Sequence, residues 1–217
     1  MNTQGTAMKH LPNILTVSRI VMVLVFVLMA TLAEPYYFGK SQTEMYALRW
    51  IAYIMVILAG LTDLLDGYLA RKLNIVSDFG ALMDPLADKI FVTGTMLMAI
   101  EFDLMPAFIA VLVLCREFMV TGLRTLAAKK QVVISADRWG KLKTALQMVM
   151  LAIAGFAWVM DGGVAYLHDA KWYGVRLWYL WLAYLWSIVL VTVLSGAGYF
   201  IKYRHLFLPG KEEGQKK

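Results

Sequence analysis

Residues 63–88 read DLLDGYLARKLNIVSDFGALMDPLAD, and this stretch joins the ends of two apolar segments. It holds four aspartates, namely Asp63, Asp66, Asp84 and Asp88. The first two lie three residues apart and the last two lie four apart, so in helices the members of each pair share one face. Because the connector, roughly residues 72–80, is short, we expect antiparallel neighbouring helices with all four carboxylates at one depth.

The composition indicates a membrane protein. Of the 217 residues, 60% are hydrophobic and only 17% are charged, whereas about a quarter are charged in soluble domains. We therefore expect one membrane domain over residues 1–217, with a short N-terminal segment (1–11) and a polar tail (205–217). The net charge of +6 comes from basic residues in the loops, which favours attraction to anionic lipid over binding of nucleic acid.

The apolar pattern predicts an all-α integral membrane fold with six transmembrane helices. A spanning helix needs about 20 apolar residues, and six stretches qualify: 14–33, 45–65, 82–101, 105–126, 143–161 and 177–201. Most lysines and arginines between these stretches fall on the side that carries the N-terminus. Since basic residues accumulate in cytoplasmic loops, we expect both termini and the aspartates to face the cytoplasm.

The aspartates predict a metal centre. Four carboxylates at close quarters repel each other unless protons or a cation neutralise them. Oxygen ligands without a neighbouring His or Cys favour Mg²⁺ or Mn²⁺, and four carboxylates suffice for two ions, as in two-metal phosphoryl transfer. Because Mg²⁺ usually completes its shell with substrate phosphates, the cluster indicates a phosphate-bearing substrate.

Small and basic residues follow the first aspartate pair. Gly67 and Ala70 remove side-chain bulk, so a ligand can approach the backbone. Arg71 can bind phosphate with its planar guanidinium group. The alternative is a purely structural network, in which the carboxylates cap helix ends or pair with Arg71 and Lys89. The number and spacing of the aspartates argue against it.

Four residues lie around the expected start of the next helix. Gly80 is expected to allow a tight turn before it. Pro85 suits the first turn of a helix, which places Asp84 at or near the N-cap. Ser77 either caps the loop or contacts a ligand.

The complete pattern, D-x2-D-G-x2-A-R-x8-G-x3-D-x3-D from residue 63 to 88, resembles the signature of the CDP-alcohol phosphotransferase family. The resemblance implies a six-helix membrane enzyme, usually a homodimer, that transfers a group from a CDP-linked donor to an alcohol and releases CMP. It also implies that the four aspartates bind metal and that Asp88 acts as the base on the acceptor hydroxyl. Donor contacts are expected at Gly67, Ala70, Arg71, Ser77 and Gly80.

Residues 12–20, PNILTVSRI, resemble the start of those family members that make phosphatidylglycerol phosphate. Asn13 and Thr16 lie at the inner end of the first apolar stretch, where both are expected to contact the nucleotide of CDP-diacylglycerol. Arg19 is expected to face the cavity. The alternative for Asn13 is a simple helix cap.

A second block, formed by residues 116–124 and 140–144, resembles the same members. Arg116 and Arg124 lie two helical turns apart on one face, and Lys141 and Lys143 begin the next helix at the same membrane surface. Together they predict a cationic pocket for a phosphorylated acceptor such as sn-glycerol 3-phosphate, with Glu117 orienting Arg116. The alternative for the lysines is an anchoring role at lipid headgroups.

The resemblance therefore predicts transfer of the phosphatidyl group from CDP-diacylglycerol to sn-glycerol 3-phosphate, in a bacterial inner membrane with the active site facing the cytoplasm. Phosphatidylinositol-phosphate or cardiolipin synthesis by the same fold is the nearest alternative, because inositol phosphate is also anionic. A membrane cation transporter is a remote alternative. It would need acidic residues near the bilayer midplane, whereas the aspartates lie at one end of their helices.

Overall fold

The computed structural model describes residues 3–34, 41–73, 78–132, 134, 138–161, 164–169 and 171–204. Within these ranges it gives the side chains of all residues except 3–12, 63–73, 78, 81, 161 and 164–166. The expected donor contact Ser77 lies outside the described residues.

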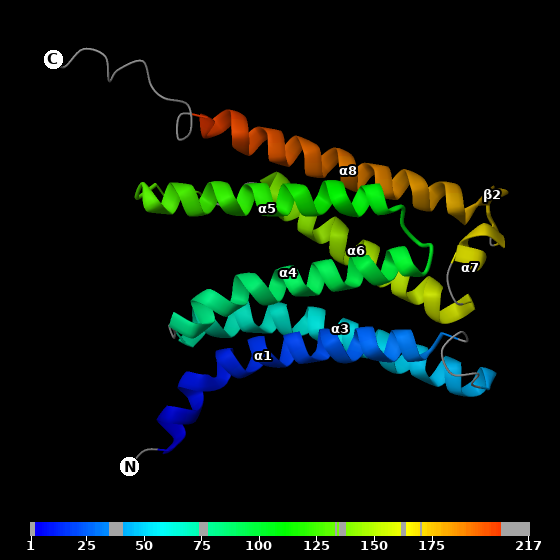
Figure 1. The fold of residues 1–217 in the computed structure, drawn as a ribbon, viewed down its shortest axis with the longest axis horizontal. Coiled ribbons are helices and arrows are strands. Elements are labelled where there is room, and N and C mark those ends of the chain that lie inside the picture. The colour runs from blue at the N-terminus through cyan, green and yellow to red at the C-terminus, as the bar shows by residue number, and fades with distance from the viewer. Residues whose placement is uncertain are drawn as a thin grey trace. The chain divides into compact units, whose positions relative to one another are not determined.

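Long helices dominate the described chain (Figure 1). They are α1 (Thr3–Leu32), α3 (Gln42–Leu73), α4 (Asp78–Glu101), α5 (Ala107–Lys129), α6 (Arg138–Asp161) and α8 (Leu177–Lys202). A short helix, α7 (Val164–Asp169), and a two-stranded hairpin of β1 (Lys171–Trp172) and β2 (Val175–Arg176) lie between α6 and α8. The predicted helical class is confirmed, and each predicted apolar stretch falls on one of the long helices.

Four of these helices are long and apolar enough to cross a membrane, judged on the described residues. They are Asn13–Leu32 of α1, Gln42–Thr62 of α3, Arg138–Met160 of α6, and α8. The remaining two, α4 and α5, have 24 and 23 residues, which is sufficient length for a span. Their charge sets them apart, because α4 carries aspartates and α5 carries arginines within the apolar stretch.

The boundaries between α3 and α4 differ from the sequence expectation. Helix α3 continues to Leu73 and α4 begins at Asp78, so the turn expected at Gly80 is wrong and Gly80 lies buried inside α4. The first-turn position expected for Pro85 is also wrong, because Pro85 lies within α4. Residues 78–83 continue the helix ahead of the proline, and Asp78 suits a helix start since its charge opposes the macrodipole.

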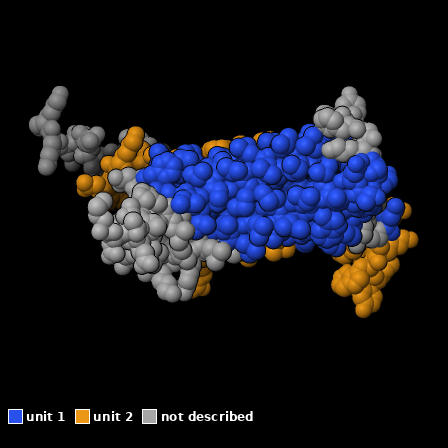
Figure 2. Space-filling model, turned by 90° about the horizontal axis from the view of Figure 1, so that it is seen from below, with its two compact units in different colours: residues 1–104, 151–170 blue, residues 105–150, 171–217 orange. Residues whose placement is uncertain are grey.

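Contacts divide the chain into two compact units, which Figure 2 shows in different colours. Unit 1 comprises Met1–Leu104 and Leu151–Ala170, and unit 2 comprises Met105–Met150 and Lys171–Lys217. Helix α6 contributes to both, since the division falls after Met150. The single-domain organisation stays a prediction.

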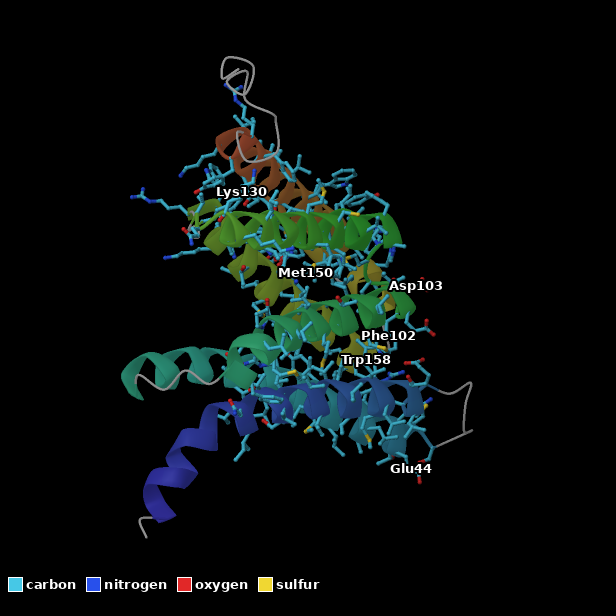
Figure 3. The ribbon with its side chains drawn as sticks, turned by 60° about the vertical axis from the view of Figure 1, so that its left-hand side comes forward. Glu44, Phe102, Asp103, Lys130, Met150 and Trp158 are labelled. Carbon is cyan, nitrogen blue, oxygen red and sulfur yellow. The ribbon has the colours of Figure 1, made fainter. Side chains whose placement is uncertain are left out.

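In unit 1, α1 packs along both α3 and α4. Alanines allow the close approach: Ala30, Ala52, Ala59 and Ala87 have no exposed surface. Towards the end of α6, the ring of Trp158 stacks on Phe102 with centroids 4.5 Å apart (Figure 3).

Two charged side chains, Glu34 and Arg49, contact Trp158 in unit 1. Its indole Nε1 donates a hydrogen bond to Glu34 Oε1 at 3.1 Å, and the guanidinium of Arg49 lies 5.7 Å from its ring centroid. Arg49 also forms an ion pair with Glu34, at 3.7 Å. The end of α1, the start of α3 and the end of α6 are thereby joined.

In unit 2, α5 packs along α8. The hairpin that precedes α8 turns through Tyr173 and Gly174, whose φ angles are 48° and 79°. Two positive φ values match the tight two-residue turns that join antiparallel strands. The hairpin lies outside the six apolar stretches, and the sequence did not predict it.

Candidate active site

Two of the four predicted metal-binding aspartates have described side chains, and both lie on α4. Asp84 and Asp88 are one helical turn apart and exposed. Thr16 of α1, only 1% exposed, donates a hydrogen bond from Oγ1 to Asp84 Oδ1 at 2.5 Å. The bond to a buried hydroxyl limits the orientations open to the carboxylate. Thr16, expected to contact the nucleotide, therefore lies against an aspartate and fixes its position.

The other two aspartates lie in the last turns of α3, together with Gly67, Ala70 and Arg71. The helix continues through all of them, but their side chains are outside the described set. Among the side chains that are described, no three His, Cys, Asp or Glu residues are grouped to hold a metal. Because half of the predicted ligands fall outside that set, the metal centre stays a prediction.

The described part of the cluster nevertheless fits a hard divalent cation. Asp84 and Asp88 present carboxylate oxygens from adjacent turns of one continuous helix. Thr16 contributes another oxygen beside Asp84. An all-oxygen donor set is the type that Mg²⁺ and Mn²⁺ prefer.

Asn13 lies beside an open groove on α1. The groove has a volume of about 590 Å³, within the range of ligand pockets. Its walls are mainly apolar, formed by Asn13, Ile14, Val17, Ser18, Val21, Met22 and Phe79. Arg19, in contrast, is buried at 2% exposure. Asn13 is thus a polar residue at a mainly apolar groove.

The predicted cationic residues of α5 and α6 meet in unit 2. Arg116 donates from Nη1 to Glu117 Oε1 at 3.3 Å and from Nη2 to Ser195 Oγ at 2.6 Å. Lys143, 4% exposed, donates from Nζ to the same Glu117 oxygen. One carboxylate therefore faces two cations. We call Arg116, Glu117, Lys143 and Ser195 the ion-pair group.

Arg124 joins this group through an aromatic ring. The phenol of Tyr199, 3% exposed, lies 5.6 Å from the guanidinium carbons of both Arg116 and Arg124. Its hydroxyl accepts a hydrogen bond from Arg124 Nη2 at 3.1 Å. Arg116 is half-buried and Arg124 is exposed, and cation–π contacts are weaker at exposed positions.

Lys141, also predicted to line the cationic pocket, does not join the ion-pair group. It is exposed, and it lies two residues before Lys143, which turns it to another side of α6. The position suits an anchor at the membrane surface better than a pocket wall.

Sequence reasoning missed the contribution of α8. Ser195 and Tyr199 are uncharged and are not among the residues that the sequence singles out. Gly196 allows close packing, because a Cβ there would approach Arg116 Cγ to 3.1 Å, whereas Gly198 has open space around it. In an aromatic-rich helix, nothing in the sequence marks Tyr199 as an arginine partner.

The carboxylates with Thr16 and Asn13 belong to unit 1, and the ion-pair group with Arg124 and Tyr199 belongs to unit 2. Each set of residues is brought together within its own unit. Residues 9–193 match the family model described as CDP-alcohol phosphatidyltransferase. The chain belongs to this family.

Individual members of the family are similar to this chain over most of its length. The chain is 36% identical over 198 residues to the CDP-diacylglycerol–glycerol-3-phosphate 3-phosphatidyltransferase of Bacillus subtilis, covering 90% of this chain and 95% of the relative. Identity to the protein of the same name from Rickettsia typhi is 35%, over 89% and 96% of the two chains. A probable phosphatidylglycerophosphate synthase of Mycobacterium tuberculosis is 35% identical, over 88% and 79%.

Proposed function

We propose that the chain transfers the phosphatidyl group of CDP-diacylglycerol to sn-glycerol 3-phosphate, giving phosphatidylglycerol phosphate and CMP. The relatives that match nine-tenths of the chain carry this activity in their names. The observation that carries the acceptor assignment is the ion-pair group. Arg116 and Lys143 both contact the carboxylate of Glu117, and cationic side chains gathered in a low-dielectric site favour binding of an anion.

The donor half of the proposal rests on the aspartate pattern and on Thr16. Asp63, Asp66, Asp84 and Asp88 would hold Mg²⁺ or Mn²⁺, two ions in our proposal, and the bound metal would neutralise the donor diphosphate and the leaving CMP. Thr16 holds Asp84 by its hydrogen bond. Asn13, Gly67, Ala70, Arg71, Ser77 and Gly80 are the proposed contacts to CDP-diacylglycerol.

Asp88 is the proposed general base. The acceptor hydroxyl oxygen attacks the phosphorus that carries the diacylglycerol, the bond from that phosphorus to the CMP oxygen breaks, and the hydroxyl proton passes to the Asp88 carboxylate. CMP leaves with the bonding electron pair. The exposed position of Asp88 on α4 supports this role, because a general base must reach a substrate proton.

The acceptor phosphate is proposed to bind Arg116, Arg124 and Lys143, with Lys141 attracting it from the surface. A guanidinium presents paired N–H groups that match phosphate oxygens. Glu117, Ser195 and Tyr199 orient these cations rather than bind the phosphate. An acceptor without phosphate, such as serine or choline, does not need this group.

We further propose six spans, with α4 and α5 crossing the membrane although they carry charge. Intramembrane charges are costly and usually mark functional sites, and here they are the proposed site residues themselves. Both termini and the active site then lie on the cytoplasmic side of a bacterial inner membrane. The functional unit is proposed to be a homodimer.

The proposal is tested by release of labelled CMP from CDP-diacylglycerol in detergent with Mg²⁺, adding each acceptor separately. Glycerol 3-phosphate is expected to stimulate release, and inositol phosphate and phosphatidylglycerol are not. Stimulation by either of those instead reassigns the chain within its family. Asp88→Asn is expected to abolish release without lowering the melting temperature, and near-normal turnover removes Asp88 from its role.

A further inference from the structure

Gln147 of α6 is a buried polar side chain that the proposed chemistry leaves unused. It is 2% exposed, and its Nε2 has no hydrogen-bond partner among the described residues. Buried amide groups are nearly always hydrogen-bonded, and leaving one unpaired costs free energy. In a helix apolar enough to span a membrane, such a group is expected to have a ligand.

The position of Gln147 points to the acceptor. It follows Lys143 by four residues, so the two share a face of α6. Long helical side chains lean towards the helix N-terminus, which directs the amide over the turn that carries Lys143. Lys143 in turn contacts Glu117 of the ion-pair group.

Two more buried polar atoms near this group lack partners in the part of the chain that the structure describes. One is Nε of Arg116, whose two other nitrogens are bonded, and the other is Oγ1 of Thr192. Thr192 has no exposed surface and precedes Ser195 by one turn of α8. The residues around the ion-pair group thus offer hydrogen-bonding atoms in addition to the cations that are proposed to bind the phosphate.

We propose that Gln147 is a specificity-determining residue, which donates from Nε2 to the unreacting hydroxyl of the acceptor alcohol. This inference rests on the proposed function. The phosphate of glycerol 3-phosphate occupies the cations, one hydroxyl attacks the donor, and the middle hydroxyl remains. A hydroxyl oxygen accepts from an amide N–H, and a site built around such a bond rejects an analogue that lacks the hydroxyl.

The matching substrate probe is 3-hydroxypropyl phosphate, which keeps the phosphate and the reactive primary hydroxyl but lacks the middle one. For the wild type, we expect kcat/KM to favour glycerol 3-phosphate over this probe by about tenfold. Gln147→Met keeps the side-chain volume and removes the amide. It is expected to bring the ratio close to one, through loss of activity on glycerol 3-phosphate and little change with the probe.

The controls separate structural from specific effects. Replacing an unpaired buried amide by an apolar group is close to neutral for folding, so the Gln147→Met melting temperature is expected to match the wild type. If that variant does not fold, Gln147→Asn, which withdraws the amide by one methylene, is expected to lower the ratio at an unchanged melting temperature. Gln42→Leu, at an exposed position of α3, is expected to keep the wild-type ratio.

Failure of this inference is distinguishable from failure of the proposed function. If glycerol 3-phosphate does not stimulate the wild type, the proposed function is wrong. If the wild type uses glycerol 3-phosphate but does not discriminate against the probe, only the role of Gln147 is overturned. A folded Gln147→Met protein with the wild-type ratio overturns it equally and leaves a bridging water as the partner of the amide.

Discussion

The ring of Tyr199 supports two arginines that lie two turns apart on α5. Both guanidinium carbons are 5.6 Å from its centroid, and the hydroxyl accepts a hydrogen bond from Arg124. The ring face and the hydroxyl therefore act separately. The face attracts both cations, and the hydroxyl fixes the orientation of one.

This division predicts the effects of two substitutions at Tyr199. Tyr199→Phe keeps the ring and releases Arg124, so we expect a rise of about 3- to 10-fold in the acceptor KM from the loss of one hydrogen bond. Tyr199→Leu removes the ring and is expected to raise it further. The KM for CDP-diacylglycerol measured in the same assays is expected to stay constant. A larger change in the donor KM would contradict a role for Tyr199 in acceptor binding.

Glu117 predicts a link between stability and anion binding. Glu117→Gln leaves Arg116 and Lys143 without their shared countercharge, and breaking a buried ion pair from one side is destabilising. We expect a lower melting temperature in detergent. Inorganic phosphate is expected to raise it more in the variant than in the wild type, because an anion that binds only the folded state stabilises it.

Lys171→Gln is the control for that experiment, since it removes an exposed charge in β1, outside the proposed acceptor site. Its melting temperature is expected to stay at the wild-type value with and without phosphate. An equal phosphate response in wild type and Glu117→Gln would show that the anion does not bind at the ion-pair group.

For single residues, the sequence indicated the charged side chains and the adjacent partner Glu117, but not the partners that lie far along the chain. Arginines and aspartates inside apolar helices are conspicuous because they are costly there, so Arg116 and Asp84 were predicted. Their partners, Ser195 and Thr16, are separated from them by 79 and 68 residues. Residues of ordinary type at such separations become neighbours only through helix packing, which no local pattern encodes.

Among the elements, helix existence was predictable and helix ends were not. Apolar runs locate six helices because lipid selects for them. The last turns of α3 and the first turns of α4 are polar, so the sequence assigns roughly residues 72–80 to a connector. The structure extends α3 to Leu73 and begins α4 at Asp78, so the connector is shorter than expected. All four aspartates lie on helices, as the sequence predicts.

Helix packing predicts different effects on stability when two glycines, Gly155 of unit 1 and Gly198 of unit 2, are replaced by alanine. A Cβ at Gly155 of α6 would lie 2.7 Å from the Tyr53 ring, whereas one at Gly198 of α8 would meet nothing within 4 Å. Tyr53 is also held by its hydrogen bond to the Ala152 carbonyl at 3.1 Å. Gly155→Ala is therefore expected to destabilise the protein by about 1–3 kcal/mol.

Gly198→Ala is the matched substitution. With space around it and a better helix former in place of glycine, it is expected to keep or raise the melting temperature. Thermal unfolding in detergent measures both variants. Equal melting temperatures for the two would contradict the close approach of α3 and α6 in unit 1.

For the whole molecule, charge distribution and span number together predict the orientation in the membrane. Lys130, at the end of α5, and Lys171, in β1, are both exposed. Between them lies α6, whose residues Arg138–Met160 are apolar and long enough to span a bilayer. A single crossing places the two lysines on opposite sides, and the excess of basic residues places Lys130 in the cytoplasm.

Single-cysteine labelling measures this directly. Cys115 is the one cysteine of the chain, so Cys115→Ala provides a background into which Lys130→Cys or Lys171→Cys is introduced. A membrane-impermeant maleimide added to spheroplasts is expected to label position 171 and spare position 130. Inverted vesicles are expected to give the opposite result. Labelling of both positions from one side would mean that α6 does not cross, and the proposed six spans would then be wrong. The reverse pattern would keep the spans and turn the active site outward, where cytoplasmic glycerol 3-phosphate cannot reach it.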